Sequence, residues 1–261
     1  MTVEVPGQAP IVFDLGTGLR PYGERIGTDE AFHGTVLLSH LHWDHVQGLP
    51  FFTPLHNPAT TLNVHGPRQA EGPLAAVFAE LMRPPFFPIR PQDLAGDVQF
   101  HDTGDDDFPV GLAKVRSRWV RHVGPTLGFR IDWNGASIAY VPDHGPGCVP
   151  DDPDDFIPHE ILDLCDGVDV LIHDAQHTSD EYGPKRHWGH STIDYALHVA
   201  REAGVRQLVL FHHDPSHRDD DLDLISLAAS ERAEGMGGLE VVTAHEGLEL
   251  EVANELHGSE R

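Results

Sequence analysis

The sequence has little positive charge and little sulfur. Only two of its 261 residues are lysines, and 17 basic residues stand against 42 acidic ones, which gives a formal net charge of −25. A body this acidic repels polyanions, so the composition argues against long nucleic acid and anionic membrane as partners. The two cysteines, Cys148 and Cys165, form no CxxC pair and are too few for a disulfide framework.

Long hydrophobic runs are also missing. No apolar run reaches the roughly 20 residues that a membrane helix needs. The N-terminus lacks the basic and then apolar pattern of a signal peptide. We therefore expect a cytoplasmic protein. The length suits one well-buried domain, which we expect over residues 1–254, followed by a frayed tail over residues 255–261.

Short apolar runs and helical periodicities follow one another along the chain. Strands are expected at residues 2–5, 11–13, 35–39, 61–65, 98–101, 113–120, 126–131, 137–141, 168–173, 207–211, 239–243 and 248–252. Helices are expected at residues 68–82, 158–165, 191–203 and 220–234. Many strands come first and β–α alternation follows, which favours two packed sheets with helices outside.

Polar segments separate the expected strands and helices. Ser191, with Asp194 three residues later, is typical of a helix N-terminus. Three acidic runs, at residues 105–107, 151–155 and 219–223, lack the glycine and terminal glutamate of an EF-hand loop. We expect them to be solvated turns or helix starts rather than calcium sites.

The segment from Ser39 to His45 is the most informative part of the chain. It has the order His-x-His-x-Asp-His and follows the apolar run 35–38. On extended backbone, His40 and His42 point the same way and can hold one metal ion. If a helix then begins, Asp44 and His45 swing toward a second ion. Imidazole with carboxylate suits zinc or a similar first-row ion, whereas a merely polar loop does not need this ligand density.

Two metal ions need more ligands than one segment supplies. Further candidates stand directly after apolar strands, where loops converge. They are His122, Asp143, His173 with Asp174, and His212 with His213 and Asp214. Any one of them alone is an ordinary polar strand end, but their recurrence favours a shared site.

In this order the motifs resemble those of the metallo-β-lactamase superfamily of dinuclear hydrolases. The resemblance runs from Asp14, which begins an Asp-x-Gly-x-Gly segment, to His212. Within the superfamily the chain is most similar to the ribonuclease Z and cyclic-phosphodiester hydrolase branch. His173-Asp174-Ala175 resembles that branch's His-Glu-Ala element, and His190-Ser191-Thr192 resembles its His-Ser-Thr element.

The resemblance implies an α/β fold, a four-layer αββα sandwich, and a set of ligands. The first ion takes His40, His42 and His122. The second takes Asp44, His45 and His212. Asp143 bridges the two ions, and His213 is the rival of His212. Asp14 is expected to hold a ligand histidine by a hydrogen bond, although a simple turn aspartate before Gly16 is the alternative.

Two departures from the family pattern matter. Only 13 residues precede Asp14, which is short for this part of the family's fold, so the first N-terminal strand can be missing. The stretch 51–97 carries just three basic residues, Arg68, Arg83 and Arg90. It therefore resembles a pocket-covering insertion rather than the basic arm with which ribonuclease Z relatives grip transfer RNA.

The resemblance also implies a mechanism. Two divalent ions, zinc first and manganese or iron as alternatives, hold a bridging hydroxide that attacks phosphorus. Two ions carry +4, and Asp44, Asp143 and hydroxide return −3, so the site keeps about +1 and attracts a phosphodiester. His190 is expected to protonate the leaving group, with Asp174 orienting it. Without the resemblance, His190 is equally well a helix-entry residue.

The expected function is therefore hydrolysis of a small cyclic or nucleotide phosphodiester, with His190, Asp174 and Asp44 as catalytic residues, in a monomer or a homodimer. A hydrolase of a thioester, lactone or β-lactam is the first alternative, but it does not need a proton donor at His190. A diiron oxidoreductase usually has Glu at the place of His42. A non-catalytic metal-binding regulatory protein usually loses ligands, and all seven are present here.

Overall fold

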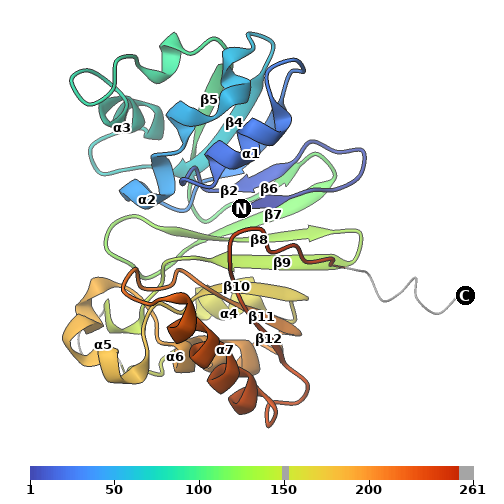
Figure 1. The fold of residues 1–261 in the computed structure, drawn as a ribbon, viewed down its shortest axis with the longest axis vertical. Coiled ribbons are helices and arrows are strands. Elements are labelled where there is room, and N and C mark those ends of the chain that lie inside the picture. Colours follow the sequence, from blue (N-terminus) through green and yellow to red (C-terminus); the bar gives the residue numbers. More distant parts are fainter. Residues whose placement is uncertain (149–152, 253–261) are drawn as a thin grey trace, which may run out of the picture. The chain divides into compact units, whose positions relative to one another are not determined.

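The structure is a computed structural model that describes residues 1–148 and 153–252. Its strands form two sheets with helices beside them (Figure 1), which confirms the α/β class. The chain divides into two compact units. Unit 1 comprises Met1–Gly104 and Val110–Leu112, and unit 2 comprises Asp105–Pro109 and Ala113–Arg261. The expectation of a single domain stays a prediction, and the tail at residues 255–261 lies outside the described residues.

Unit 1 contains a five-stranded sheet in the order β1-β2-β3-β4-β5. Its strands are β1 Thr2–Val3, β2 Ile11–Phe13, β3 His33–Leu37, β4 Thr61–Pro67 and β5 Asp97–Thr103, and its α-helices are α1 Leu19–Ile26, α2 Trp43–Val46 and α3 Leu74–Leu81. β1 is antiparallel to β2, whereas β2 through β5 are parallel. Parallel strands end at one edge of the sheet, where ligand sites gather in α/β folds. The segments after β2 and β3 therefore meet at that edge.

The core of unit 1 lies between this sheet and its helices. Buried side chains come from α1 and α3 and from one face of β2, β3 and β4. They include Leu19, Phe78, Val12, Val36 and Val64. This packing fixes the strand ends from which the motif of residues 39–45 projects.

Unit 2 carries most of a seven-stranded sheet in the order β12-β11-β10-β9-β8-β7-β6. Its strands are β6 Asp107–Val110, β7 Ala113–Trp119, β8 Leu127–Trp133, β9 Ala136–Val141, β10 Val170–Asp174, β11 Gln207–Phe211 and β12 Glu240–Thr243. β7, β8 and β9 form antiparallel pairs, whereas β9, β10, β11 and β12 are parallel. A tight turn joins β8 to β9, with Asn134 and Gly135 both at positive φ.

Helices cover one face of the parallel part of this sheet. The unit has α4 His159–Cys165, α5 Ser179–Lys185, α6 Ile193–Glu202 and α7 Asp219–Ala233. Side chains of α4, α6 and α7 pack with those of β9, β10 and β11 into one buried cluster. Because β7, β9, β10 and β11 run in the same direction, the residues that follow them emerge at one edge. That edge carries His122, Asp143, Asp174 and His212.

Several element predictions need correction. No strand forms at residues 248–252, and the helix expected from residue 68 begins only at Leu74. Helices α1 and α5 were missed because each contains a proline and a glycine. Pro21 in the first turn of α1 is tolerated there, and Gly23 leaves room for the ring of Phe52, which an added Cβ would meet at 2.8 Å.

The predicted helix start at Ser191 and the predicted acidic turns agree with the structure in part. α6 is capped by Thr192, whose hydroxyl accepts from the Tyr195 N–H at 3.0 Å, so the expected cap at Ser191 was wrong by one residue. The run 219–223 does begin a helix, α7, and residues 105–107 are exposed, as expected. Asp151 and Asp152 lie outside the described residues. Among the described residues, no helix has both the length and the apolar character that crossing a membrane requires.

Candidate metal-ligand clusters

Four of the seven predicted ligands lie in unit 1, directly after β3. We call His40, His42, Asp44 and His45 the first ligand cluster. His42 has extended backbone and α2 begins at the next residue, so the expected change from strand to helix is present. The His40 ring lies 4.4 Å from the His42 ring and 4.2 Å from the His45 ring, centroid to centroid. Asp44 Oδ2 lies 3.1 Å from His45 Nε2. The short segment thus gathers three imidazoles and one carboxylate.

Asp14 supports this cluster from the end of β2. It is buried, and its Oδ2 accepts a hydrogen bond from His45 Nδ1 at 2.7 Å and from the Ser39 hydroxyl at 3.0 Å. Its Oδ1 accepts from the Ser39 backbone N–H at 2.6 Å. His45 Nδ1 carries a proton and donates it to this carboxylate. The lone pair of the ring is therefore on Nε2, the atom that could bind a metal ion.

The backbone of Asp14 has a positive φ of 57°. Such a conformation costs free energy for a residue with a side chain, and it persists only where surrounding contacts enforce it. The Asp14 N–H bonds the Leu37 carbonyl at 3.1 Å, and the Leu15 N–H bonds the His45 carbonyl at 2.8 Å. The strained residue is therefore held from both sides by the segments that carry the ligands.

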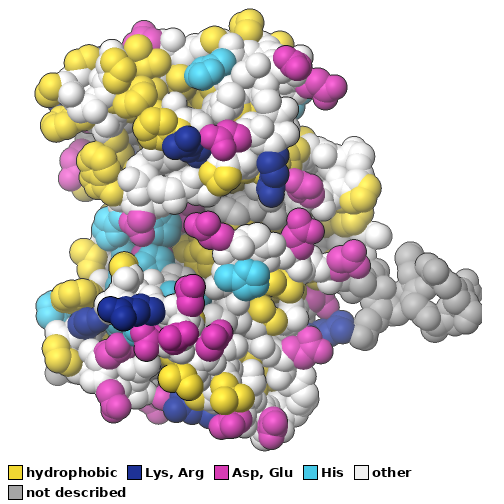
Figure 2. Space-filling model, viewed as in Figure 1, with side chains coloured by type: hydrophobic (Ala, Val, Ile, Leu, Met, Phe, Trp, Pro, Cys, Tyr) yellow, Lys and Arg dark blue, Asp and Glu magenta, His cyan; other side chains and the backbone are white. Residues whose placement is uncertain are grey.

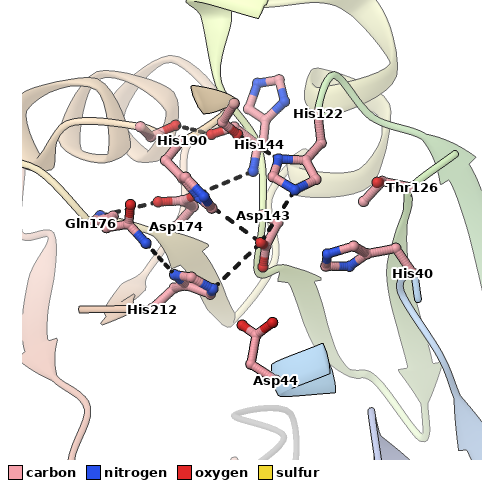
Figure 3. Close-up of polar contacts among 12 residues, drawn as sticks. His40, Asp44, His122, Thr126, Asp143, His144, Asp174, Gln176, His190 and His212 are labelled. Atoms are coloured by element: carbon pink, nitrogen blue, oxygen red, sulfur yellow. Dashed lines mark hydrogen bonds and ion pairs between the residues drawn. The ribbon is translucent and has the colours of Figure 1, made fainter. Parts of the chain in front are cut away.

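The remaining predicted ligands lie in unit 2. They are His122, Asp143 and His212. Together with His190, the predicted proton donor, we call them the second ligand cluster (Figure 3). Asp143 is 1% exposed, and its Oδ2 lies 3.5 Å from His122 Nε2, 3.4 Å from His212 Nε2 and 3.9 Å from His190 Nδ1. The His190 and His212 rings stack with centroids 4.9 Å apart. One buried carboxylate thus sits among three imidazoles that come from separate loops.

These spacings fit a first-row metal ion. A tetrahedral ion with bonds of about 2.0–2.2 Å separates neighbouring ligand atoms by roughly 3.4 Å. The two Nε2 atoms of His122 and His212 stand at such distances from Asp143 Oδ2. One ligand atom each of Asp143, His190 and His212 lies within 4.8 Å of the others. The donor set, imidazole nitrogen with carboxylate oxygen, is the one that zinc takes in proteins.

A buried carboxylate behind the second ligand cluster organises it. Asp174, at the end of β10, is fully buried, and its Oδ2 accepts from His190 Nδ1 at 2.8 Å and from the His144 N–H at 3.1 Å. Its Oδ1 accepts from the Gln176 N–H at 3.0 Å. The expected pairing of Asp174 with His190 is therefore present as a contact, and the other ring nitrogen of His190 points away from the carboxylate.

Two further histidines line this region. His173 was among the candidates from the sequence, whereas His144 was not. His144 and His173 are fully buried, and burial lowers the pKa of both, so they stay neutral. His144 Nε2 lies 3.1 Å from the Tyr195 hydroxyl, and His173 Nδ1 donates to the Asp174 carbonyl at 2.7 Å. Both are thus held against Asp174, His144 through its backbone N–H and His173 through its ring.

His212 and His213 make different contacts, and the ligand role of His212 stays a prediction. His212, at a positive φ of 58°, turns its ring toward Asp143. His213 instead donates from Nε2 to the Ala244 carbonyl at 3.1 Å. Gln176, whose amide nitrogen lies 2.9 Å from His212 Nδ1, was missed by the sequence reasoning. Its place two residues after Asp174 was the only available signal.

The chain is similar to known proteins over most of its length. Residues 23–213 match the model of the beta-lactamase superfamily domain. An uncharacterized protein of Mycobacterium tuberculosis is 29% identical over 95% of this chain and 84% of that protein. A ribonuclease Z of Haloferax volcanii is 27% identical over 93% of this chain and 86% of that enzyme. The short form of human tRNase Z superposes with a TM-score of 0.68 at 18% identity, covering 97% of this chain and 91% of that one.

Proposed function

The chain belongs to the metallo-β-lactamase superfamily and is a hydrolase of that superfamily, and on this premise we propose that it is a dinuclear metal-dependent phosphodiesterase. Its substrate is a small cyclic or nucleotide phosphodiester. Ribonuclease Z, a relative by sequence, is named for action on a phosphodiester polymer. The proposal narrows this chemistry to small substrates for reasons of charge.

The proposal assigns two divalent ions, zinc in the first place, to the seven ligands. In this assignment His40, His42 and His122 would hold one ion, Asp44, His45 and His212 would hold the other, and Asp143 would be a ligand to both. The imidazole spacing within the first ligand cluster and the spacing around Asp143 in the second support this assignment. Such ions lower the pKa of coordinated water toward about 7 and stabilise negative charge on a phosphoryl oxygen.

The observation that carries the choice of a phosphodiester is the contact between His190 and Asp174. Departure of an alkoxide from phosphorus requires a proton, and a positioned imidazole can supply it. The buried Asp174 carboxylate holds His190 Nδ1 at 2.8 Å. This contact orients the ring with Nε2 turned away from Asp174, and the proposal makes Nε2 the atom that gives its proton to the leaving group. The superfamily alternatives that open a thioester, lactone or β-lactam do not require this donor.

Charge limits the size of the substrate. Figure 2 shows acidic side chains distributed over the visible face with few Lys and Arg among them. Such a surface repels a long polyanion, whereas two ions against three anionic groups leave a local positive charge that attracts a single phosphodiester. The scarcity of basic residues in the stretch 51–97 supports the same restriction.

The test measures metal content and the dependence of turnover on the leaving group. We expect the purified protein to hold two equivalents of zinc per chain and to hydrolyse cyclic nucleotides and nitrophenyl phosphodiesters but no thioester. His190→Ala keeps both ions, and it lowers turnover of a diester with a poor leaving group at least about tenfold more than turnover of a nitrophenyl diester.

His198→Ala, on helix α6 of the same unit, is the matched control and leaves both rates unchanged. Equal losses on both diesters in His190→Ala remove the proton-donor role. Thioester or lactone turnover without phosphodiester turnover replaces the proposal by its alternative.

A further inference from the structure

An exposed tryptophan lies two residues before the proposed proton donor. Trp188 ends a short 3₁₀ turn, Arg186–Trp188, and its side chain is 51% exposed. Gly189 and then His190 follow it directly. Tryptophan has the largest aromatic face of all side chains, and aromatic faces commonly line sites that bind small molecules.

The backbone after Trp188 is held against the second ligand cluster. The Gly189 carbonyl lies 2.7 Å from His122 Nδ1, and a Cβ added at Gly189, which has a positive φ of 92°, would meet the same atom at 2.6 Å. On the other side of this glycine, His190 turns toward Asp143 (Figure 3). Consecutive Cα atoms are about 3.8 Å apart, so the indole of Trp188 starts at the margin of the cluster.

Two contacts hold the ring of Trp188. The Lys185 ammonium lies 5.6 Å from the ring centroid, a cation–π contact, and it donates to Asp214 Oδ2 at 2.7 Å. The buried His177 ring meets the Trp188 ring edge to face at 6.5 Å and the His190 ring at 6.1 Å, centroid to centroid. A ring that is already held loses little conformational freedom when a ligand stacks on it.

The segment that carries this indole is close to neutral. Residues 182–193 contain no Asp or Glu, whereas the whole chain has 42 acidic residues. The charges of Lys185 and Arg186 in this segment are balanced by Asp214 and Asp154, which come from other parts of unit 2. An anionic ligand that approaches along the segment therefore meets less repulsion than along the acidic runs of the chain.

We propose that Trp188 stacks the nucleobase of the substrate while the phosphodiester reaches the second ligand cluster. This inference rests on the proposed function and narrows its substrate class to phosphodiesters of nucleotides. Stacking requires a planar π face, which a base has and a sugar lacks, and a purine offers a larger face than a pyrimidine. In a nucleotide only the sugar separates the base from the phosphorus. The span from Trp188 to His190 is similarly short, because both rings contact His177.

The experiment compares two substrates of the full chain that differ only in the base. One is the 2′,3′- or 3′,5′-cyclic phosphate of adenosine, whichever is turned over faster, and the other is the same cyclic phosphate of 1-O-methylribose. We expect Trp188→Ala to raise KM for the adenosine substrate about 5–100-fold. Its kcat, and both constants for the base-free substrate, change by less than about twofold, because only binding of the base is lost.

Further variants separate stacking from bulk. Trp188→Phe keeps a planar face, so we expect a smaller rise in KM than in Trp188→Leu, which keeps apolar bulk without a π face. Trp133→Ala is the matched control. Trp133 is half-buried in the same unit, at the end of β8 that pairs with the start of β9, whereas Asp143 follows the end of β9. This variant keeps the wild-type KM for both substrates.

Binding of a mononucleotide gives a second measurement that needs no turnover. We expect adenosine monophosphate to quench part of the tryptophan fluorescence of wild type and of Trp133→Ala, but not that of Trp188→Ala. Ribose 5-phosphate, which has no base, leaves the fluorescence of all three proteins unchanged.

The outcomes separate this inference from the proposed function. If both cyclic phosphates are hydrolysed and Trp188→Ala keeps the wild-type KM for the adenosine substrate, the role of Trp188 is refuted while the phosphodiesterase stands. Equal constants for Trp188→Leu and Trp188→Phe refute stacking in favour of bulk. If wild type hydrolyses no phosphodiester, the proposed function fails and the fluorescence decides alone. Quenching that requires Trp188 then supports a nucleotide site at this ring, and quenching that persists in Trp188→Ala refutes it.

Discussion

The support of the first ligand cluster by Asp14 gives a prediction whose size can be worked out from the contacts. The buried carboxylate receives three donors, the Ser39 N–H, the Ser39 hydroxyl and His45 Nδ1. Removing the acceptor leaves buried donors unsatisfied, at about 1–3 kcal/mol each. The Ser39 hydroxyl also reaches His40 Nδ1 at 3.0 Å, so part of that loss is recovered. Asp14→Ala is therefore expected to lower the free energy of unfolding by about 4 kcal/mol.

Asp14→Asn removes the negative charge of the side chain but keeps its shape. Asparagine has the same size, tolerates the positive φ of 57° and still accepts one hydrogen bond. Its amide nitrogen, however, faces a second donor, so we expect a loss of about 2 kcal/mol. His45 also loses the partner that keeps its proton on Nδ1, and zinc affinity is expected to fall by about 10–100-fold.

The assay is urea unfolding in the presence of a chelator, so that the stability of the chain is measured apart from metal binding, together with a separate zinc competition assay. Asp97→Asn is the control. This exposed carboxylate accepts a hydrogen bond from the Gln99 side chain at the surface, and the substitution should change stability by less than about 0.5 kcal/mol. If Asp14→Asn unfolds within about 0.5 kcal/mol of wild type and binds zinc equally well, Asp14 does not organise the cluster.

Two further predictions concern stability. Burial, and then the neighbouring His101, lower the pKa of His65 from its usual 6.5 to about 4. Since the unfolded chain takes up the proton first, the contribution of neutral His65 is complete above pH 6.5 and is lost as pH falls toward 4, which unfolding measured across that range will show. His65→Gln flattens the slope whereas His33→Gln, at an exposed histidine, does not, and an unchanged slope in His65→Gln contradicts the argument. Leu171→Ala removes a fully buried side chain of β10, and we expect it to lower the free energy of unfolding in urea by about 2–5 kcal/mol. The control Leu227→Ala, at a side chain of α7 that is 59% exposed, should lower it by less than about 0.5 kcal/mol. Similar losses in the two variants would contradict the assignment of Leu171 to the core.

Local motifs made much of this protein predictable. The order His-x-His-x-Asp-His after an apolar run predicts a strand, an extended ligand pair and a helix, and β3, His42 and α2 follow in that way. These features depend on residues close in sequence, whose backbone geometry decides which side chains share a direction. The α/β class followed from the same kind of local periodicity. The sequence did not predict helices α1 and α5, because the proline and glycine in each weaken the local helical signal. Tertiary packing stabilises both helices nevertheless.

The roles of individual histidines required the tertiary structure. His212 and His213 are equivalent as sequence, and only the contacts with Asp143 and Ala244 distinguish them. The same holds for Gln176, which is joined to His212 across 36 positions of the chain. The amino-acid sequence alone determined which chemical groups stand at the ends of the strands. Which of those groups meet was decided by the parallel pairing of β9, β10 and β11, because hydrogen-bond partners distant in sequence are set by strand register and packing rather than by local propensity.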